Sequence, residues 1–464
     1  MFRHILIFFV ASILFYSCER IGNSPVSGIG FSTDTVFFDT VFTSVGTATK
    51  ELRVKNTGKT SLVINHISLA GGQSSKFRLN IDGEPVNEKD NIPIDAGDSI
   101  FIFIDAFINP LSSDSPVTVT DSIIFNVNDN LRSVKLLAWG QDINLIKDGI
   151  IKNAVWVKGK PYVIYNQATV DSLGTLTIDE GVKVLFHRNS VMTIYGTLIV
   201  NGQFSQPVLF ASDRTEMMYE DIPGQWTGIE FKNSSKGNII NNAIIRNSVY
   251  GLRADDLNSN NGFPDIKINS SVIAHSSVSG ISASNSNILA ANCIIYHCGI
   301  NCISISGGGV YNFVFCTLFN RWDYGFRLTP VFLVSEKPSE KITLTLVNTV
   351  LYGDNISELN MIPSGSTLTG NYIFDHCLVK LDTLHSAFWK TDLFPYTSAN
   401  KNPLFIDLEK WDLRPDTLSP LINRGNQSYS AAYPFDVRGV SRSSNGIPDI
   451  GAYERLPGEH KKVK

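Results

Sequence analysis

The chain has 464 residues, and its 39 Lys and Arg nearly balance its 43 Asp and Glu, which gives a formal net charge of −4. This balance gives no reason to expect nucleic acid or an anionic membrane surface as a partner, because both attract clustered positive charge. The length predicts at least two domains. With 35 Gly, 19 Pro and no long run of apolar residues at helical spacing, the composition favours short strands joined by turns.

Residues 1–17 have the features of an export signal. Arg3 and His4 precede the apolar run ILIFFVASILF, which is too short to serve as a lasting bilayer anchor. The run ends at LFYSC, where a small residue precedes Cys18, and this resembles the lipobox of bacterial lipoproteins. The resemblance implies cleavage before Cys18, lipids on that cysteine and a membrane-tethered mature chain. The alternative is an ordinary signal peptide with a chance cysteine.

The residues after Cys18 bear on the destination of the chain. Glu19 and Arg20 follow it, in place of the Asp that can hold lipoproteins at the inner membrane. An outer-membrane lipoprotein is therefore expected, and the sequence leaves open whether it faces the cell surface or the periplasm.

A polar spacer at residues 18–30 leads into an expected β-sandwich at residues 31–142. In KELRVKNTGKTSLVINHISLAG, apolar residues alternate with polar ones on both sides of the turn Asn56-Thr57-Gly58. Further short strands are expected in DSIFIFIDAFINP and DSIIFNVNDNLRSVKLLAWGQD. This half resembles the Ig-like modules that precede β-helices in exported lipoproteins of Bacteroidetes-type bacteria. The resemblance implies a module that spaces or presents something else.

Residues 143–400 are expected to form a parallel β-helix. In GTLTIDEGVKVLFHRNSVMTIYGTLIVNGQFSQPVLFAS, short alternating strands are separated only by turns. Parallel strands normally need long crossovers, unless the chain coils and stacks on itself. Two segments repeat in step, TGIEF/YGLRA/SGISA/NCISI/YGFRL at intervals of 23, 29, 22 and 23 residues, and AIIRN/SVIAH/CIIYH/CTLFN at 28, 22 and 23. A period near 23 residues indicates one β-helix rung.

The stretch CIIYHCGINC places Cys293, Cys298 and Cys302 within ten residues, at repeat positions where other rungs carry small residues. Free cysteine packs as a small buried hydrophobe, which favours a place in the core. The spacing matches no standard zinc pattern, and a Cys293–Cys316 disulfide between rungs is the other alternative. His297 aligns with His275, and rungs about 4.8 Å apart allow the two rings to meet.

An insertion in the repeat, DDLNSNNGFPD, spaces oxygen donors around a Gly turn in a way that suits Ca²⁺. It is similar to the calcium loops of thrombospondin type 3 repeats, but its Gly falls one place late and two acidic ligands are Asn. A solvated turn is the alternative. The candidate ligands are Asp255, Asp256, Asn258, Asn260 and Asp265.

Aromatic residues beside the repeated glycines are candidates for glycan contact, because an aromatic face packs on a sugar ring. They are Trp226, Tyr250, Trp322 and Tyr324. Filling of rung corners is the alternative. Sugar-cleaving β-helices resembling pectate lyases would also need acidic calcium ligands and a basic residue, for which Arg246, Arg253, Lys267, Arg321 and Arg327 are candidates. No cluster of three acids recurs at one strand position, and no catalytic residue is assigned.

Residues 401–456 resemble the end of choice-of-anchor Q type right-handed β-helix proteins, in which DIGAYE, Asp449 to Glu454, is the mark. The resemblance implies an exported β-helix without settling a reaction. An open β-helix end exposes unpaired backbone groups, so we expect this segment to be a structural cap. Residues 457–464 form a polar tail.

These observations predict an all-β protein, an Ig-like sandwich followed by a right-handed parallel β-helix with a C-terminal cap. The expected function is display of an elongated binding face for a polysaccharide. The alternatives are a polysaccharide lyase or glycoside hydrolase on that face, and a structural or adhesive surface protein. Calcium is the only cofactor suggested, and no protein partner or oligomeric state is indicated.

Replacement of the expected lipidation site tests the predicted anchor. We expect Cys18→Ala to prevent lipid attachment, so that the protein leaves the membrane fraction and no longer incorporates labelled palmitate. A Cys18→Ala variant that still partitions with membranes would show that the anchor lies elsewhere.

Overall fold

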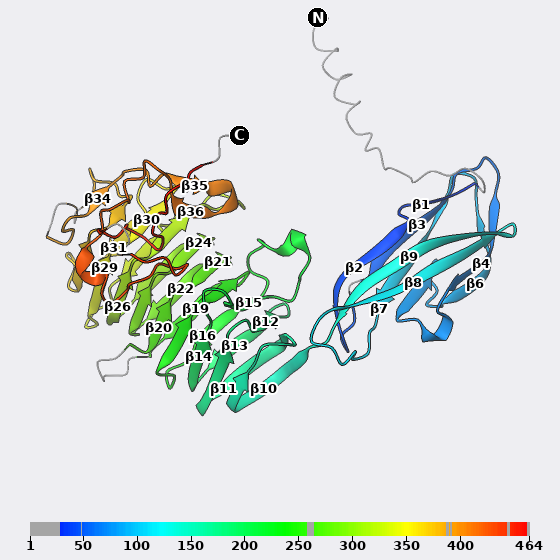
Figure 1. The fold of residues 1–464 in the computed structure, drawn as a ribbon, viewed down its shortest axis with the longest axis horizontal. Coiled ribbons are helices and arrows are strands. Elements are labelled where there is room, and N and C mark those ends of the chain that lie inside the picture. The colour runs from blue at the N-terminus through cyan, green and yellow to red at the C-terminus, as the bar shows by residue number, and fades with distance from the viewer. Residues whose placement is uncertain are drawn as a thin grey trace, which may run out of the picture. The chain divides into compact units, whose positions relative to one another are not determined.

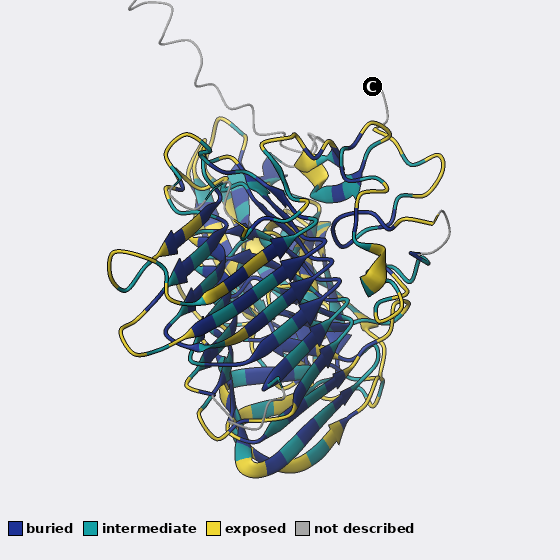
Figure 2. Ribbon diagram, turned by 90° about the vertical axis from the view of Figure 1, so that its left-hand side faces the viewer, coloured by how far each residue is buried: buried dark blue, intermediate teal, exposed yellow. Residues whose placement is uncertain are grey.

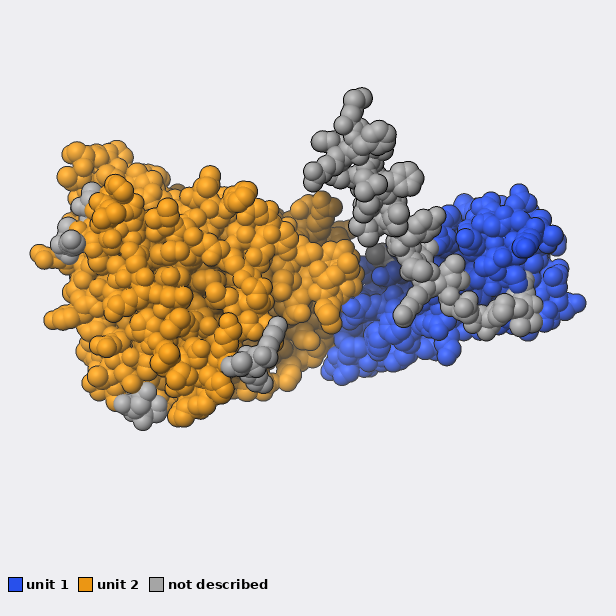
Figure 3. Space-filling model, turned by 90° about the horizontal axis from the view of Figure 1, so that it is seen from above, with its two compact units in different colours: residues 1–143 blue, residues 144–464 orange. Residues whose placement is uncertain are grey.

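The computed structural model describes residues 28–47, 49–257, 264–386, 389, 392–442 and 446–461. The chain divides into two compact units, residues 1–143 and 144–464 (Figure 3). The described residues form strands and short 3₁₀ turns and contain no α-helix, which confirms the all-β prediction. None of the helical turns described has the length and apolar character needed to cross a membrane.

The first unit is a β-sandwich of two sheets. One has the order β1 (Ile29–Phe31), β3 (Lys50–Asn56), β7 (Ser99–Ala106) and β5 (Phe77–Ile81). The other has the order β2 (Thr35–Phe42), β9 (Asn130–Gln141), β8 (Val117–Val127), β4 (Leu62–Leu69) and β6 (Glu88–Ile94). The residues that alternate in the sequence, such as Leu52, Val54, Ile64 and Ile67, are fully buried in one core. Strand alternation therefore predicted which side chains point between the sheets.

The second unit is a parallel β-helix with three strands in each rung. It begins with the long strands β10 (Asn144–Trp156) and β11 (Tyr162–Asp179). From there to β33 the strands pair in parallel with the strand three places later in the chain, as β21 does with β24 and β24 with β27, and the last pair is β33 with β34. The stacked strands make three faces, which appear as a ladder of arrows in Figure 1.

Each face is a column of short strands. Face 1 contains β12 (Lys183–Phe186), β15 (Val208–Ser212), β18 (Ala243–Arg246), β21 (Val272–Ser276), β24 (Ile294–Cys298), β27 (Thr317–Asn320), β30 (Val350–Gly353), β33 (Leu378–Val379) and β34 (Ser398–Ala399). Face 2 contains β13 (Val191–Ile194), β16 (Gly228–Phe231), β19 (Tyr250–Asp255), β22 (Ser279–Ser284), β25 (Asn301–Ser306), β28 (Phe332–Ser335) and β31 (Leu359–Ile362). Face 3 contains β14 (Thr197–Asn201), β17 (Asn238–Asn241), β20 (Ile266–Asn269), β23 (Ile288–Ala291), β26 (Gly309–Val314), β29 (Ile342–Val347) and β32 (Asn371–Asp375).

The interior of the solenoid is a continuous apolar core. Buried and partly exposed residues alternate along the stacked strands, as the bands in Figure 2 show. The register pairs Ser276 with Cys298 and Ile281 with Ile303, so the repeat found in the sequence is the rung for these units. The prediction is wrong for YGFRL, residues 324–328, which lies in a loop; β25 pairs instead with the later strand β28, with Ile303 opposite Phe332. Period-2 alternation thus places one side chain of each pair inside the coil.

The cysteines described are part of this core. Cys293, Cys298, Cys302, Cys316 and Cys377 are all buried free thiols. The alternative of a Cys293–Cys316 disulfide is therefore wrong, while the interpretation as small core residues fits their burial. Within the described residues, no group of three His, Cys, Asp or Glu side chains is placed to hold a metal ion.

The C-terminal part of the chain covers more than the open end of the coil. Leu381 and Phe394 close the last rungs, where Phe394 stacks on Phe374 with ring centroids 4.7 Å apart. The later segment, which includes β35 (Phe405–Asp407) and β36 (Asp412–Pro415), lies instead along the outer side of face 1. Its contacts there join Phe405, Leu413, Leu421 and Ile450 to Ile294, Phe319, Val350 and Leu378. The sequence predicts that residues 401–456 cover the end of the coil, but the apolar side chains that point outward from face 1 require a cover as well, and this segment buries them.

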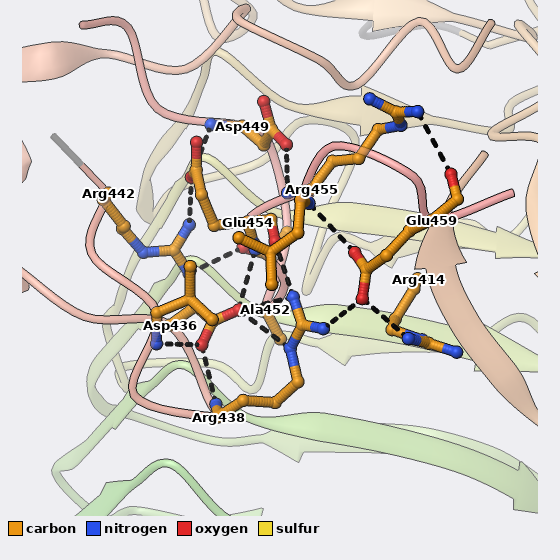
Figure 4. A network of polar contacts seen from close by, with 12 residues as sticks. Arg414, Asp436, Arg438, Arg442, Asp449, Ala452, Glu454, Arg455 and Glu459 are labelled. Atoms are coloured by element: carbon orange, nitrogen blue, oxygen red, sulfur yellow. Dashed lines mark hydrogen bonds and ion pairs between the residues drawn. The ribbon is translucent and has the colours of Figure 1, made fainter. Parts of the chain in front are cut away.

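The DIGAYE motif holds this segment in place through buried charges (Figure 4). Asp449, Glu454 and Arg442 are fully buried. The Arg442 guanidinium donates to Asn292 Oδ1 at 2.9 Å and to the Gly451 carbonyl at 3.0 Å, and it lies 3.9 Å from the centroid of the Phe315 ring. The motif thus joins the C-terminal segment to rungs far away in sequence, as its structural interpretation predicts.

Burial dominates the electrostatics of this network. It raises the pKa of Glu454 to about 7, with the nearby Asp449 carboxylate adding to the rise. Burial also lowers the pKa of Arg442 to about 10. Glu454 Oε2 accepts the backbone N–H of Asp449 at 3.1 Å, so the carboxyl group retains a hydrogen bond in the interior.

Removal of the buried arginine tests its role in docking. We expect Arg442→Ala to lower the free energy of unfolding of the second unit by about 3–5 kcal/mol, because it leaves buried carboxylates without their cation. Urea unfolding followed by circular dichroism measures the loss. Arg424→Ala, at an exposed position of the same segment, is the matched control and should cost less than about 0.5 kcal/mol. Equal losses in the two variants would contradict the role of the network.

Candidate functional site

The connections from face 1 to face 2 are short turns in some rungs and long loops in others. Short turns at residues 247–249, 277–278 and 299–300 follow β18, β21 and β24, whereas loops 213–227 and 321–331 follow β15 and β27. The first loop contains the 3₁₀ turn η2 (Met217–Tyr219) and projects beside β15 in Figure 1. A Cβ added to Gly224 would lie 2.8 Å from Ser277 Oγ, and one added to Gly299 would lie 3.2 Å from the Trp322 ring. Both loops therefore pack on the short turns between them.

Two stacked histidines lie at these turns. His275 and His297 are neighbours in the register of β21 and β24, and their Nδ1 atoms are 2.6 Å apart. Both have φ of 52°, in the left-handed region, as does Asn247 one rung earlier with φ of 67°. The expected meeting of the two rings is confirmed. A histidine in this backbone region stores strain that the surrounding contacts must offset.

The contacts of the pair favour one arrangement of protons. Only one of the two Nδ1 atoms can donate to the other. His275 Nε2 lies 3.2 Å from Asp221 Oδ1, which favours a proton on this Nε2 and leaves His275 Nδ1 to accept from His297 Nδ1. His297 Nε2 then carries a lone pair; it is buried and has no hydrogen-bond partner among the described residues. Asp323 Oδ2 is 3.9 Å away, too far for a hydrogen bond.

Both rings are held neutral at pH 7. Burial lowers the pKa of His275 to about 4, and the Arg246 guanidinium adds to this effect. Burial also lowers the pKa of His297 to about 4, with the neighbouring His275 ring as the next cause. The pair therefore offers hydrogen-bonding atoms without positive charge.

Aromatic rings surround His297. The centroid of Trp411, next to β36, is 4.7 Å from that of His297, and those of Trp322 and Tyr324 on loop 321–331 are 5.1 Å and 5.8 Å away. Trp411 also stacks on Tyr296 at 5.1 Å. Tyr324 is 56% exposed, so this group of rings reaches the surface. We call the group Asp221, His275, His297, Trp322, Asp323, Tyr324 and Trp411 the His275–His297 site.

Charged side chains form the rim of the site. Arg246 pairs with Glu220 at 2.8 Å. Arg321 pairs with Asp323 at 3.0 Å and with Glu409 at 2.8 Å, and its guanidinium lies 4.9 Å from the centroid of the Trp411 ring. The rim thus combines carboxylate acceptors with guanidinium donors beside aromatic faces.

The predicted aromatic stripe is only partly present. Trp322 and Tyr324 lie in the His275–His297 site, while Tyr250 is half-buried at the start of β19 with the Arg253 guanidinium 5.5 Å from its ring centroid. The prediction of glycan contact is wrong for Trp226, which is fully buried, stacks on Phe186 at 3.8 Å and donates its Nε1 hydrogen to the Arg246 carbonyl. This indole fills the interior of a rung, as the alternative interpretation of these aromatics proposed.

The basic residues considered for catalysis also differ in their placement. Arg246 and Arg321 lie on the rim, but Arg327 is buried and makes two short contacts, 2.6 and 2.9 Å, with the Glu358 carboxylate. A buried bidentate pair of this kind holds loop 321–331 to the next rung and has a structural role.

The predicted calcium ligands have other contacts where they are described. Asp255 accepts from Arg253 Nε at 2.8 Å, Asp256 accepts from Asn285 Nδ2 at 2.9 Å, and the buried Asp265 accepts from the Asn287 backbone at 2.9 Å. Asn258 and Asn260 lie outside the described residues. Local contacts thus account for these three carboxylates, and calcium binding stays a prediction.

Three residues of the site and its rim, Asp221, Glu409 and Trp411, carry no motif in the sequence that marks them as functional. The one signal was the length of the segments between repeat units, since loops 213–227 and 321–331 are insertions at one corner of the rung. Trp411 comes from a segment whose docking could not be inferred from rung periodicity.

The first unit has a concave surface of its own, with a volume of about 660 Å³. Its lining is Thr49, Arg78, Leu79, Asn80, Pro85, Asn87, Phe103 and Asp105. This lining contains one Arg and one Asp but no His or Trp.

Comparison with known proteins bears mainly on the fold. The family model described as "Right handed beta helix region" matches residues 143–329. That match agrees with the predicted right-handed β-helix. Among curated protein sequences, none matches this chain.

Solved structures give weak likenesses. A family 123 glycoside hydrolase from Clostridium perfringens, whose title concerns glycolipid glycan hydrolysis, has 9% identity and a TM-score of 0.19, with 26% of each chain covered. The ASH/PapD-like domain of human CEP192 has 10% identity and a TM-score of 0.18, with 27% of this chain and 92% of that one covered. The chain thus spans about a quarter of the glycoside hydrolase, and neither likeness carries an argument about function.

Acid titration tests the environment of the two histidines. Their pKa of about 4 lies below the ordinary 6.5, so their contribution to stability is complete above pH 6.5 and is lost as the pH falls from 6.5 toward 4. Each ring contributes at most about 3 kcal/mol to this loss. We expect a His275→Asn/His297→Asn variant, which repeats the residue type of Asn247 one rung earlier, to lose up to about 5 kcal/mol less than wild type between pH 7 and pH 4.5, because two rings are removed. Identical pH dependence of urea unfolding in the two proteins would contradict the assignment.

Proposed function

We propose that this protein binds a glycan at the His275–His297 site. The observation that supports the proposal is the convergence of Trp322, Tyr324 and Trp411 around hydrogen-bonding groups at one corner of the solenoid. A sugar ring has apolar C–H faces and a rim of hydroxyl groups. Aromatic faces pack on the former and charged or neutral polar atoms bind the latter.

Each part of the site has a role in this proposal. Tyr324 and Trp322 provide the stacking surface, because they lie on the loop that reaches the surface. Asp221 and Asp323 accept hydrogen bonds from hydroxyl groups. In the described part of the chain the buried His297 Nε2 has no hydrogen-bond donor, and a sugar hydroxyl that reached it would supply one.

The cellular setting is a further part of the proposal. The sequence LFYSC supports an exported outer-membrane lipoprotein anchored through Cys18, which lies outside the described residues. The β-sandwich would then act as a spacer that presents the β-helix, which carries the site. A rigid solenoid suits display, because rung-to-rung hydrogen bonds fix the strands from which the loops of the site project.

An enzyme is the second candidate, and the histidine pair favours it. A carboxylate oriented toward His275, which in turn accepts from His297, leaves a lone pair of the kind that a general base uses. In a polysaccharide lyase or glycoside hydrolase, His297 Nε2 would take a proton from the substrate or from water. Mass spectrometry of bound oligosaccharides after long incubation separates the two, since cleavage products appear only for the enzyme.

Truncation of the exposed tyrosine tests the binding proposal. We expect Tyr324→Ala to weaken binding of an oligosaccharide identified on a glycan array by about tenfold, because loss of one stacking face costs about 1.4 kcal/mol. Isothermal titration calorimetry measures the change. Tyr195→Ala, at an exposed tyrosine on another turn of the solenoid, is the control and should bind as wild type does. Unchanged affinity in Tyr324→Ala would place the glycan elsewhere.

A further inference from the structure

We infer that the glycan bound at the His275–His297 site carries no carboxylates, and is a neutral oligosaccharide or one that bears amino groups. This inference rests on the proposed function and names the substrate class of the same site. It follows from the balance and the exposure of the charges that face the site.

Carboxylates outnumber cations around the two histidines. Glu220, Asp221, Asp323 and Glu409 contribute four negative charges, and Arg246 and Arg321 contribute two positive ones. The two histidine rings add no positive charge at pH 7. The group therefore has a net charge of −2.

The two guanidiniums are also the less accessible charges. Arg246 and Arg321 have side chains 28% and 22% exposed, and each is already paired with a carboxylate. The four carboxylates range from 47% exposed for Asp323 to 82% for Glu409. A ligand that enters the site meets negative charge first, and it must displace an existing ion pair before it reaches a cation.

The charges on the neighbouring loops are paired. In loop 213–227, Arg214 pairs with Glu216 at 2.9 Å, and the nearly buried Asp213 pairs with His187 at 2.8 Å. Near Glu409, the exposed Lys410 lies 4.0 Å from Asp407. Arg327 on the other loop is buried against Glu358. These neighbours leave no accessible excess of positive charge to attract an acidic polymer.

This charge distribution disfavours uronate polymers relative to neutral or amino-bearing polysaccharides. Each uronate residue carries one carboxylate, so a uronate polymer would be repelled over several sugar units within the Debye length of about 8 Å at physiological salt. Neutral sugars meet no such repulsion, and an amino group would form new ion pairs with Asp221 or Glu409. A lyase acting on uronates also requires a cation beside the sugar carboxylate, and the paired guanidiniums do not supply one freely.

Oligosaccharides of equal length provide the test. The probes are chitohexaose and cellohexaose as neutral ligands, hexaglucosamine as the amino ligand, and hexagalacturonate as the acidic ligand. Binding to the full chain is measured by calorimetry at about 20 mM and about 500 mM NaCl, a range over which salt screening changes strongly. Tyr324→Ala is measured in parallel, so that only binding at this site is counted.

We expect at least one neutral or amino probe to bind at least tenfold more tightly than hexagalacturonate at low salt. At high salt, the difference in affinity between the neutral probe and hexagalacturonate should become smaller, because salt screens the repulsion of the acidic probe. The charge variant Asp221→Asn/Glu409→Gln should raise the affinity for hexagalacturonate several-fold, whereas Asp129→Asn, at an exposed hairpin position of the first unit, should not.

Two results would overturn the inference in different ways. Hexagalacturonate that binds as tightly as the other probes, with affinity lost in Tyr324→Ala, would refute the charge argument and leave the proposed glycan site in place. Absence of binding by every probe of both classes would count against the proposed function itself, and with it against this inference.

Discussion

Parallel hydrogen bonding between successive rungs is the constraint on which the second unit depends. From β12 to β33 the strands pair with the strand three places later, so a side chain at one position of the rung lies above the equivalent side chain of the next rung. This pairing buries a continuous column of aliphatic side chains, and it leaves the chain free to lengthen only at the corners. It also brings His275 onto His297, because Ala274 and Tyr296 on one side and Ser276 and Cys298 on the other are in register. The core and the candidate site are therefore products of one repeated interaction.

The site nevertheless needs contacts that the repeat does not provide. Asp221 comes from an insertion before the histidine rungs, Asp323 and Tyr324 come from an insertion after them, and Trp411 comes from the segment that covers face 1. That segment is held by buried polar contacts such as Arg442 with Asn292 and the backbone of Ala452 with Thr317 Oγ1. Any shift of the segment would leave an unpaired charge in the interior, so these contacts oppose its displacement. The DIGAYE region thus acts on the site from a distance, by fixing the segment from which Trp411 and Glu409 project.

The periodicity of the sequence predicted the features that repeat from strand to strand and from rung to rung. The alternation of Leu52 and Val54 located the sandwich core, and the interval near 22 residues aligned Cys298 with Ser276, so the fold, the buried cysteines and the contact of His275 with His297 all followed from spacing. The sequence could not show that Trp226 is buried and Trp322 is not, because both lie at the connection between face 1 and face 2. The path of the chain there places Trp226 in the core and Trp322 on a loop. The placement of residues 402–461 along face 1 could likewise not be predicted from a local sequence pattern. It depends on which apolar side chains face outward after the rungs have formed.

The histidine pair departs from what packing alone would select. Asn247 occupies the equivalent backbone position and satisfies it with a side chain suited to positive φ, donating to loop carbonyls of Glu220 and Ile222. His275 and His297 adopt the same strained backbone, lose the solvation of their charged forms, and leave one buried nitrogen without a partner among the described residues. Each of these features costs stability, and asparagine would avoid most of the cost. Such local costs tend to occur where a group is positioned for a ligand rather than for the core. Positive φ recurs at the turns of many rungs, so the feature that distinguishes this corner among the described residues is a neutral imidazole pair beside aromatic surface, and the proposed recognition rests on that combination.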